Sequence, residues 1–249
     1  MGFTLFISDL HLCESRPNIT AAFIAWMQKE VIKAESLYIL GDFFEYWAGD
    51  DAVDTHFHPP IFGALKQAVQ NGTKIYLMHG NRDFLINHDF ASLTGVTLLH
   101  DPSLITLYGK RVLLTHGDAL CTDDVDYMAF RNQVRQPSWQ SQFLNQSVEV
   151  RKSFIQEARL KSESEKSTKT MAIMDVNPEA LESTIRAHHY PAYLIHGHTH
   201  QPNVHQHIVD DQTCVRYVLG DWYEQGSYLK IHADGSVQIG QVDCEMRGQ

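Results

Sequence analysis

The stretch YLMHGNRDF, residues 76–84, is an apolar, strand-like run that ends abruptly in His-Gly-Asn. The same ending recurs in LLTHGD at residues 113–118 and in LIHGHTH at residues 194–200. Short apolar runs of this kind are typical of buried β-strands. In an α/β sheet, ligands bind beyond the carboxyl ends of the strands. Three His-Gly endings therefore predict one site assembled from distant parts of the chain.

Strand-like and helical patterns alternate along the remaining sequence. Helical spacing of apolar residues predicts helices at 18–33, about 60–71, 84–94 and 177–189. Strands are expected at 3–8, 36–40, 74–78, 104–108, 111–116, 192–197, 203–209, 214–220, 226–232 and 236–242. The strand–helix–strand order of the front half predicts parallel neighbours, and the back half is typical of antiparallel pairing. We expect a mixed α/β fold of two stacked sheets flanked by helices.

A polar stretch, residues 122–175, interrupts this alternation. Its first part has helical spacing, with Tyr127, Phe130 and Val134 on one face. Pro137 breaks the run, and SESEKSTKT at 162–170 is expected to be loop-like. We interpret residues 122–170, approximately, as a helical cap inserted into a single domain that spans 1–249.

Composition narrows the class of protein. The chain has 249 residues, a formal net charge of −10 and four scattered cysteines. This predicts a reduced, cytosolic setting and argues against nucleic-acid binding. No apolar run approaches the ~20 residues that span a bilayer, and the start lacks the basic region of a secretory signal. Residues 131–169 nevertheless hold eight lysines and arginines against four acidic residues.

Ligand-type side chains follow the predicted strands. Carboxylates, an amide and imidazoles suit Mn²⁺, Fe²⁺ or Zn²⁺, and seven ligands fit two ions with a bridging carboxylate, for which Asp42 is the natural candidate. Taken singly, Asp42 could instead cap a helix and Asn81 could be a turn residue. Those readings do not explain the set as a whole. The predicted metal ligands are Asp9, His11, Asp42, Asn81, His116, His196 and His198.

Five blocks, DLHL, GDFFEYW, GNRDF, THGD and HGHTH, resemble the calcineurin-like metallophosphoesterase family in content and order. They extend from residue 9 to residue 200. The resemblance implies an α/β/β/α sandwich of two mixed sheets and a two-metal phosphoesterase. It assigns one ion to Asp9, His11, Asp42 and His198. It assigns the other to Asp42, Asn81, His116 and His196.

Arg82 departs from the family pattern, in which histidine usually follows the block asparagine. An arginine stays charged and cannot serve as a general acid, but its guanidinium offers a fork to phosphate oxygens. We therefore predict an electrostatic clamp and a leaving group that needs little protonation. The alternative is a surface arginine paired with Asp83. His79 and Asp83 are expected to brace the loop.

Longer stretches, among them YILGDFFEYWAGDD, HGNRDFL, THGDALCTDD and AIMDVN, closely resemble the branch of that family that hydrolyses UDP-2,3-diacylglucosamine. The resemblance implies two Mn²⁺ ions, attack of a metal-bound hydroxide on the α-phosphorus, and the products UMP and 2,3-diacylglucosamine 1-phosphate (lipid X). Asn81, Arg82 and His116 would be catalytic. The implied substrate contacts are Asn81, Arg82, Asp124, Ser162, Lys166, Lys169 and His196. An acyl-chain chamber is predicted from Tyr127, Phe130, Val134, Phe143 and Phe154, for which ordinary packing within the cap is the alternative.

A basic surface formed by Arg131, Arg135, Arg151 and Lys152 is expected to rest on anionic lipid, at ~1 kcal/mol per residue. A solvated helix face is the alternative. The first interpretation implies peripheral binding at the cytoplasmic face of the bacterial inner membrane. We also expect a monomer. Two other functions stay open: a phosphodiesterase or phosphatase acting on a soluble nucleotide, and a non-catalytic scaffold on the same fold.

Overall fold

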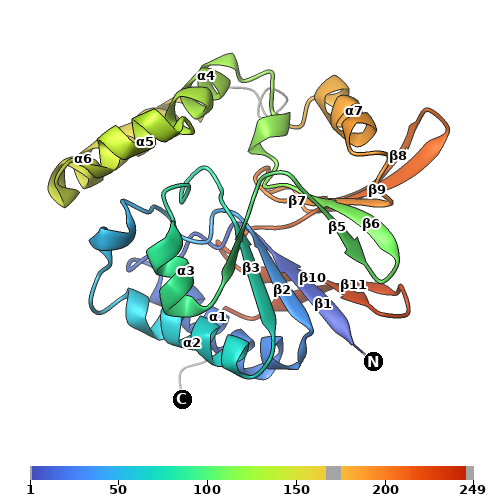
Figure 1. The fold of residues 1–249 in the computed structure, drawn as a ribbon, viewed down its shortest axis with the longest axis horizontal. Coiled ribbons are helices and arrows are strands. Elements are labelled where there is room, and N and C mark those ends of the chain that lie inside the picture. Colours follow the sequence, from blue (N-terminus) through green and yellow to red (C-terminus); the bar gives the residue numbers. More distant parts are fainter. Residues whose placement is uncertain (1, 167–174, 245–249) are drawn as a thin grey trace.

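Two mixed β-sheets face each other in the computed structural model, which describes residues 2–166 and 175–244 (Figure 1). The first sheet has the order β11–β10–β1–β2–β3–β4, and the second has the order β5–β6–β7–β9–β8. The strands of the first sheet are β1 (Phe3–Ile7), β2 (Ser36–Leu40), β3 (Lys74–Met78), β4 (Thr97–Leu99), β10 (Gly226–His232) and β11 (Val237–Val242). Those of the second are β5 (Ser103–Leu107), β6 (Lys110–Leu114), β7 (Tyr193–His196), β8 (Asn203–Val209) and β9 (Gln212–Val218).

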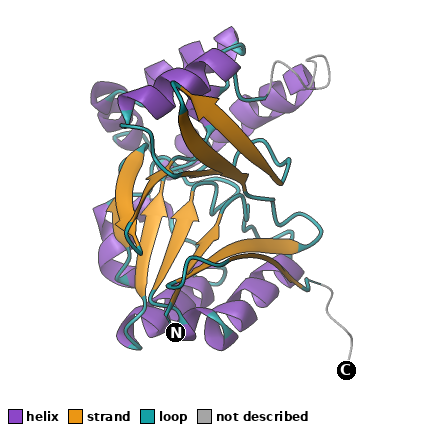
Figure 2. Cartoon of the chain, turned by 90° about the vertical axis from the view of Figure 1, so that its right-hand side faces the viewer, coloured by secondary structure: helices purple, strands orange, loops and turns teal. Residues whose placement is uncertain are grey.

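Helices cover the outer face of each sheet, as Figure 2 shows from the side. The first sheet packs against α1 (Pro17–Lys29), α2 (His58–Gln70) and α3 (His88–Thr94), and the second against α7 (Pro178–Ala187). Between the sheets lies a separate apolar layer, in which the rings of Phe6, Tyr38 and Tyr76 stack at centroid distances of 5.1 and 4.7 Å. The predicted α/β/β/α sandwich is confirmed.

Strand direction brings the candidate residues together. β1, β2 and β3 are parallel neighbours, so their carboxyl ends lie side by side. β6 and β7 are also parallel, with Leu114 opposite Ile195. The segments that follow these five strands therefore open toward one edge of the sandwich.

Three local predictions differ from the structure. β4 was not expected from the sequence. The helix predicted at 84–94 begins at His88, because the Asn87 side chain accepts a hydrogen bond from the His88 backbone N–H and caps it. The back half is not uniformly antiparallel, since β9 runs parallel to β7, and β10 and β11 belong to the first sheet.

A helical arm, α4 (Val125–Val134), α5 (Pro137–Leu144) and α6 (Val148–Lys166), projects beside the sandwich (Figure 1). Pro137 occupies the first turn of α5, where its missing N–H costs nothing, so it begins a helix after the break. Residues 162–166 continue α6, so the prediction of a loop there is wrong, and residues 167–170 lie outside the described part. Within the described ranges, we find no helix with the length and apolar character needed to cross a bilayer.

Candidate active site

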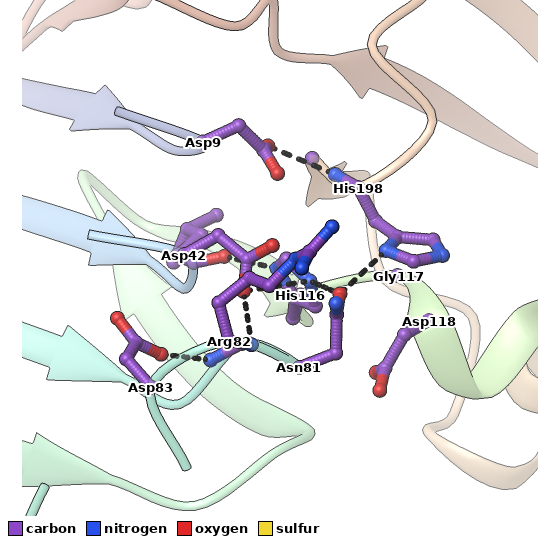
Figure 3. Close-up of polar contacts among 12 residues, drawn as sticks. Asp9, Asp42, Asn81, Arg82, Asp83, His116, Gly117, Asp118 and His198 are labelled. Carbon is purple, nitrogen blue, oxygen red and sulfur yellow. Dashed lines mark hydrogen bonds and ion pairs between the residues drawn. The ribbon is translucent and has the colours of Figure 1, made fainter. Parts of the chain in front are cut away.

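Side chains from five separated segments meet at this edge of the sandwich (Figure 3). Asp9, Asp42 and His116 each offer a ligand atom, and these atoms lie within 4.8 Å of one another. Asn81 Oδ1 lies 3.1 Å from His116 Nε2 and 3.0 Å from His198 Nδ1. His11 Nε2 lies 3.8 Å from Asp42 Oδ2. The structure thus brings together six of the seven predicted ligands, and we call this group the metal-ligand cluster.

Backbone strain marks the same residues. Asp9, His11, Asp42 and His198 have φ values of 56°, 48°, 51° and 67°, in the left-handed region that non-glycine residues rarely adopt. Each such residue costs on the order of 1–3 kcal/mol, and strain of this kind concentrates at functional sites. The strained turns aim the side chains of consecutive segments at a common point.

Two glycines are needed for close approach. A Cβ atom on Gly80 would lie 2.0 Å from Asp42 Oδ1, and one on Gly197 would lie 2.1 Å from Asp9 Oδ2. Neither glycine has a positive φ, in contrast to Gly41, whose φ is 91°. Any larger residue at position 80 or 197 would therefore clash with a carboxylate of the cluster, so glycine is needed at both.

The orientation of His116 suits a metal ligand. Its Nδ1 lies 2.8 Å from the Leu40 carbonyl oxygen and donates to it, which leaves Nε2 facing the carboxylate of Asp42 and the amide of Asn81. An outer hydrogen bond of this kind fixes the ring of a metal-binding histidine. Burial opposes its charged form, yet Asp42, Asp9 and Asp118 outweigh burial and raise the pKa of His116 to about 9.

Concentrated negative charge makes the cluster a cation site. Asp9 is fully buried, and His200 Nε2 lies 3.3 Å from its Oδ1. Burial alone would raise the pKa of Asp9, but a hydrogen bond from His200 and the charges of nearby histidines hold it below its usual range. Buried carboxylate oxygens beside imidazole nitrogens fit divalent metal ions. The oxygen and nitrogen atoms of the cluster are thus of the types predicted to bind a divalent metal ion.

His196 is placed differently from the other predicted ligands. Its Nε2 lies 3.2 Å from Nη1 of the buried Arg216, and its Nδ1 lies 2.9 Å from the Gly197 carbonyl oxygen. Burial, followed by the Arg216 charge, lowers the pKa of His196 to about 3. The polar contacts found for the His196 ring in the described part of the chain are thus with Arg216 and the Gly197 backbone.

Two residues that sequence reasoning missed belong to the site. His200 Nε2 lies 3.3 Å from Asp9 Oδ1 and 3.4 Å from His11 Nε2. Glu45 Oε2 lies 3.4 Å from His11 Nδ1. Burial would raise the pKa of Glu45, but the neighbouring His11 and two arginines lower it to about 2. His200 lies in the motif HGHTH and Glu45 in GDFFEYW. Their place within these two motifs is the feature of the sequence that could have indicated them.

The loop that carries Arg82 is braced from within. Asp83 is fully buried and accepts hydrogen bonds from the backbone N–H groups of Gly80 and Phe43, at 2.8 and 2.7 Å. His79 Nε2 lies 2.7 Å from the Ile86 carbonyl oxygen and donates to it. The expectation that both residues brace the loop is confirmed, and a surface pair between Arg82 and Asp83 is wrong.

Arg82 itself points into the site. Its backbone N–H donates to Asp42 Oδ1 at 2.8 Å, and Nη1 lies 4.0 Å from Glu45 Oε1. The side chain is only 12% exposed. The charge is therefore held next to the metal-ligand cluster.

A cavity of about 500 Å³ opens between the metal-ligand cluster and the helical arm. Its volume is within the ~300–1,000 Å³ typical of ligand sites. The predicted residues that line it are Asn81, Arg82, Asp124, Tyr127, Phe130, Phe143, Phe154, Ser162 and His198. Trp139 and Ile155 add further apolar wall. Val134 is buried within the arm and is not part of the lining. The Lys166 side chain and Lys169 lie outside the described residues.

The predicted basic surface is wrong for three of its four members, because these arginines hold the arm to the body. Arg131 Nε donates to Asp118 Oδ2 at 2.8 Å. Arg135 donates to the Gly80 carbonyl oxygen at 2.8 Å, and Arg151, 1% exposed, pairs with Asp51. Lys152 alone of the four is exposed. The charges of the three arginines anchor the helices, so the alternative of a solvated face fails for these three as well.

Comparison with known proteins gives consistent matches. The family model described as calcineurin-like phosphoesterase matches residues 4–202. A protein of Aromatoleum aromaticum named UDP-2,3-diacylglucosamine hydrolase is 48% identical over 93% of this chain and 94% of its own length. One of Escherichia coli O7:K1 with the same name is 47% identical over 93% and 95%.

Solved structures with a similar shape are more distant. One described as a novel archaeal phosphodiesterase has a TM-score of 0.47 at 13% identity, covering 96% of this chain and 99% of its own. Vps29 of Entamoeba histolytica has a TM-score of 0.44 at 13% identity, covering 98% and 99%. At these values neither likeness supports a statement about function.

Proposed function

The chain belongs to the calcineurin-like phosphoesterase family and is an enzyme, and from this premise we propose that it hydrolyses the pyrophosphate bond of UDP-2,3-diacylglucosamine. The products would be UMP and 2,3-diacylglucosamine 1-phosphate, a step in lipid A synthesis. One observation carries the proposal: a metal-ligand cluster opens directly into a cavity whose arm side includes the rings of Phe130, Trp139, Phe143 and Phe154. A substrate with a pyrophosphate next to a diacylated sugar matches both parts.

The proposed ligand sets follow the geometry and the resemblance together. Asp9, His11, Asp42 and His198 would hold one Mn²⁺ ion. Asp42, Asn81, His116 and His196 would hold the other, and His196 enters this set on the resemblance alone, because its Nε2 faces Arg216. When bound, the two ions would lower the pKa of a water molecule and neutralise charge on phosphate.

The protein side chains would orient the pyrophosphate. Arg82 is held beside the cluster, and its guanidinium would donate two parallel hydrogen bonds to phosphate oxygens. Asn81 Oδ1 lies 3.1 Å from His116 Nε2 and 3.0 Å from His198 Nδ1, so the atoms that would hold the ions lie close together. No group in this assignment protonates the leaving phosphate, since a sugar 1-phosphate is a stable anion.

The sugar and acyl chains would occupy the side of the cavity formed by the arm. Asp124 caps α4 by accepting from the Tyr127 backbone N–H, and its carboxylate also lines the cavity. Asp124 and Ser162 would contact the glucosamine, with Lys166 and Lys169 near phosphate. The acyl chains would lie against Phe130, Phe143 and Phe154, together with the Trp139 ring.

In this proposal the helical arm is a cap inserted into the single domain. It exposes apolar side chains, among them Val125 at 72%, Leu160 at 59% and Val150 at 52%. Burial of these side chains of α4 and α6 against a membrane would remove apolar surface from water, which is favourable. We propose peripheral association with the cytoplasmic face of the inner membrane, where the acylated substrate would be found.

The test compares three substrates with Mn²⁺ supplied. UDP-2,3-diacylglucosamine should be turned over with release of UMP, whereas UDP-N-acetylglucosamine and bis(p-nitrophenyl) phosphate should be poor substrates. Equal turnover of either unacylated compound would favour a phosphodiesterase for soluble substrates. Intact metal binding with no turnover of any of the three compounds would refute the proposed substrate.

A further inference from the structure

We propose that Glu45 is a positioning residue that joins the helical arm to the metal-ligand cluster. One carboxylate oxygen faces a predicted metal ligand, and the other faces arginines of the loop and the arm. The proposal rests on the proposed function only for the statement that the cluster binds a divalent metal. It is independent of the identity of the substrate.

The oxygen Oε2 serves the cluster. It lies 3.4 Å from His11 Nδ1 and accepts a hydrogen bond from Arg16 Nη2 at 3.2 Å. Since Nδ1 faces this carboxylate, the opposite nitrogen, Nε2, is the one directed at Asp42, at 3.8 Å. A carboxylate behind a metal-binding imidazole fixes the ring and makes it a better donor.

The oxygen Oε1 serves the arm. It lies 2.8 Å from Nη2 of Arg159, which belongs to α6, and 4.0 Å from Nη1 of Arg82. Arg159 and Arg82 both line the cavity. A single carboxylate therefore holds two guanidinium groups that arrive from separate elements, one from the loop after β3 and one from the arm.

The carboxylate has little freedom to exchange these partners. Glu45 is 7% exposed, and its backbone N–H donates to the Leu12 carbonyl oxygen at 3.1 Å. That bond places Glu45 beside the segment that carries His11. If the charge were removed, three guanidinium groups would lose the anion that they share, and like charges would move apart, while His11 Nδ1 would lose the carboxylate that it faces.

The experiment titrates the metal-free full-length protein with Mn²⁺ by calorimetry and measures amide exchange of residues 148–162. Glu45→Gln should weaken Mn²⁺ affinity about 10- to 100-fold. It should also speed exchange in α6. Arg159→Met should speed that exchange without changing Mn²⁺ affinity, because His11 keeps its partner.

Asp51→Asn is the matched control. Asp51 also pairs with an arginine of α6, Arg151, at 2.8 Å, but none of the polar contacts found for Asp51 in the described part of the chain is with His11. It should loosen α6 and leave Mn²⁺ affinity unchanged. Equal losses of affinity in Glu45→Gln and Asp51→Asn would overturn the proposal in favour of general loosening, and wild-type affinity in Glu45→Gln would also overturn it.

A second variant covers a failure to fold. Glu45→Asp keeps the anion among the arginines and shortens its reach toward His11, so it should fold and bind Mn²⁺ about tenfold more weakly. Unchanged affinity in Glu45→Asp, with Glu45→Gln unfolded, would count against the proposal. Neither measurement uses substrate, so a wrong substrate assignment shows itself separately, in the UMP assay.

Discussion

Replacing Arg82 with alanine separates the effect of its guanidinium from the integrity of the metal-ligand cluster. The hydrogen bond from Arg82 to Asp42 Oδ1, 2.8 Å long, comes from the backbone N–H and survives any substitution except proline. Glu45 also keeps charged partners, because Arg159 lies at 2.8 Å and Arg16 at 3.2 Å. The variant should therefore fold and bind metal normally.

The expected loss falls on turnover. The side chain is 12% exposed and is held beside the cluster, so it would act on a desolvated phosphate. Removing one preorganised donor to a developing negative charge lowers kcat about 10²- to 10³-fold, or ~2.7–4 kcal/mol. Arg82→Lys keeps the charge and loses the fork, which costs ~1.5 kcal/mol and about tenfold in kcat.

The assay measures UMP release at saturating substrate and the Mn²⁺ content of the same samples by mass spectrometry. A kcat of Arg82→Ala within about twofold of the wild-type value would refute the clamp. A loss of Mn²⁺ in proportion to the loss of turnover would refute the separation of roles, since it would make Arg82 a structural support of the cluster.

Three further outcomes test other parts of the structure. Chelation of the metal, or His116→Ala, should abolish turnover without a change in secondary structure, measured by circular dichroism; turnover in metal-free buffer would contradict the metal assignment. Arg131→Met should lower the free energy of unfolding, measured by urea denaturation, by about 3 kcal/mol, because the fully buried Asp118 loses a charged partner. A change under ~0.5 kcal/mol would show that the Arg131–Asp118 pair does not stabilise the fold. The pKa of His58 is lowered by burial, and its Nδ1 accepts a hydrogen bond from the Asp54 backbone N–H. The unfolded chain therefore takes up the proton first as the pH falls below about 6.5, and the stability of the wild-type protein relative to His58→Gln should decrease between about pH 7.5 and 5.5. A constant difference in stability over this range would contradict the linkage.

The sequence by itself was enough to predict the sandwich and most of the metal-ligand cluster. Apolar runs such as 74–78 indicate a buried strand directly, because this pattern is visible in consecutive residues of the chain. Asp9, Asp42 and His116 follow such runs immediately. Their meeting required only that parallel strands end at one edge, which the alternation of strands and helices already implies.

Other features depend on contacts between segments that are far apart in the chain, and no sequence pattern shows that these segments meet. Arg131, Arg135 and Arg151 look like a basic surface in a one-dimensional reading, yet each finds an acceptor in the body of the protein. Glu45 and Arg159 are 114 positions apart and meet only because α6 lies over the loop after β2. Periodicity shows which face of an element is buried, but the partner of a charged side chain is chosen by the packing of whole elements, and only the tertiary structure contains that information.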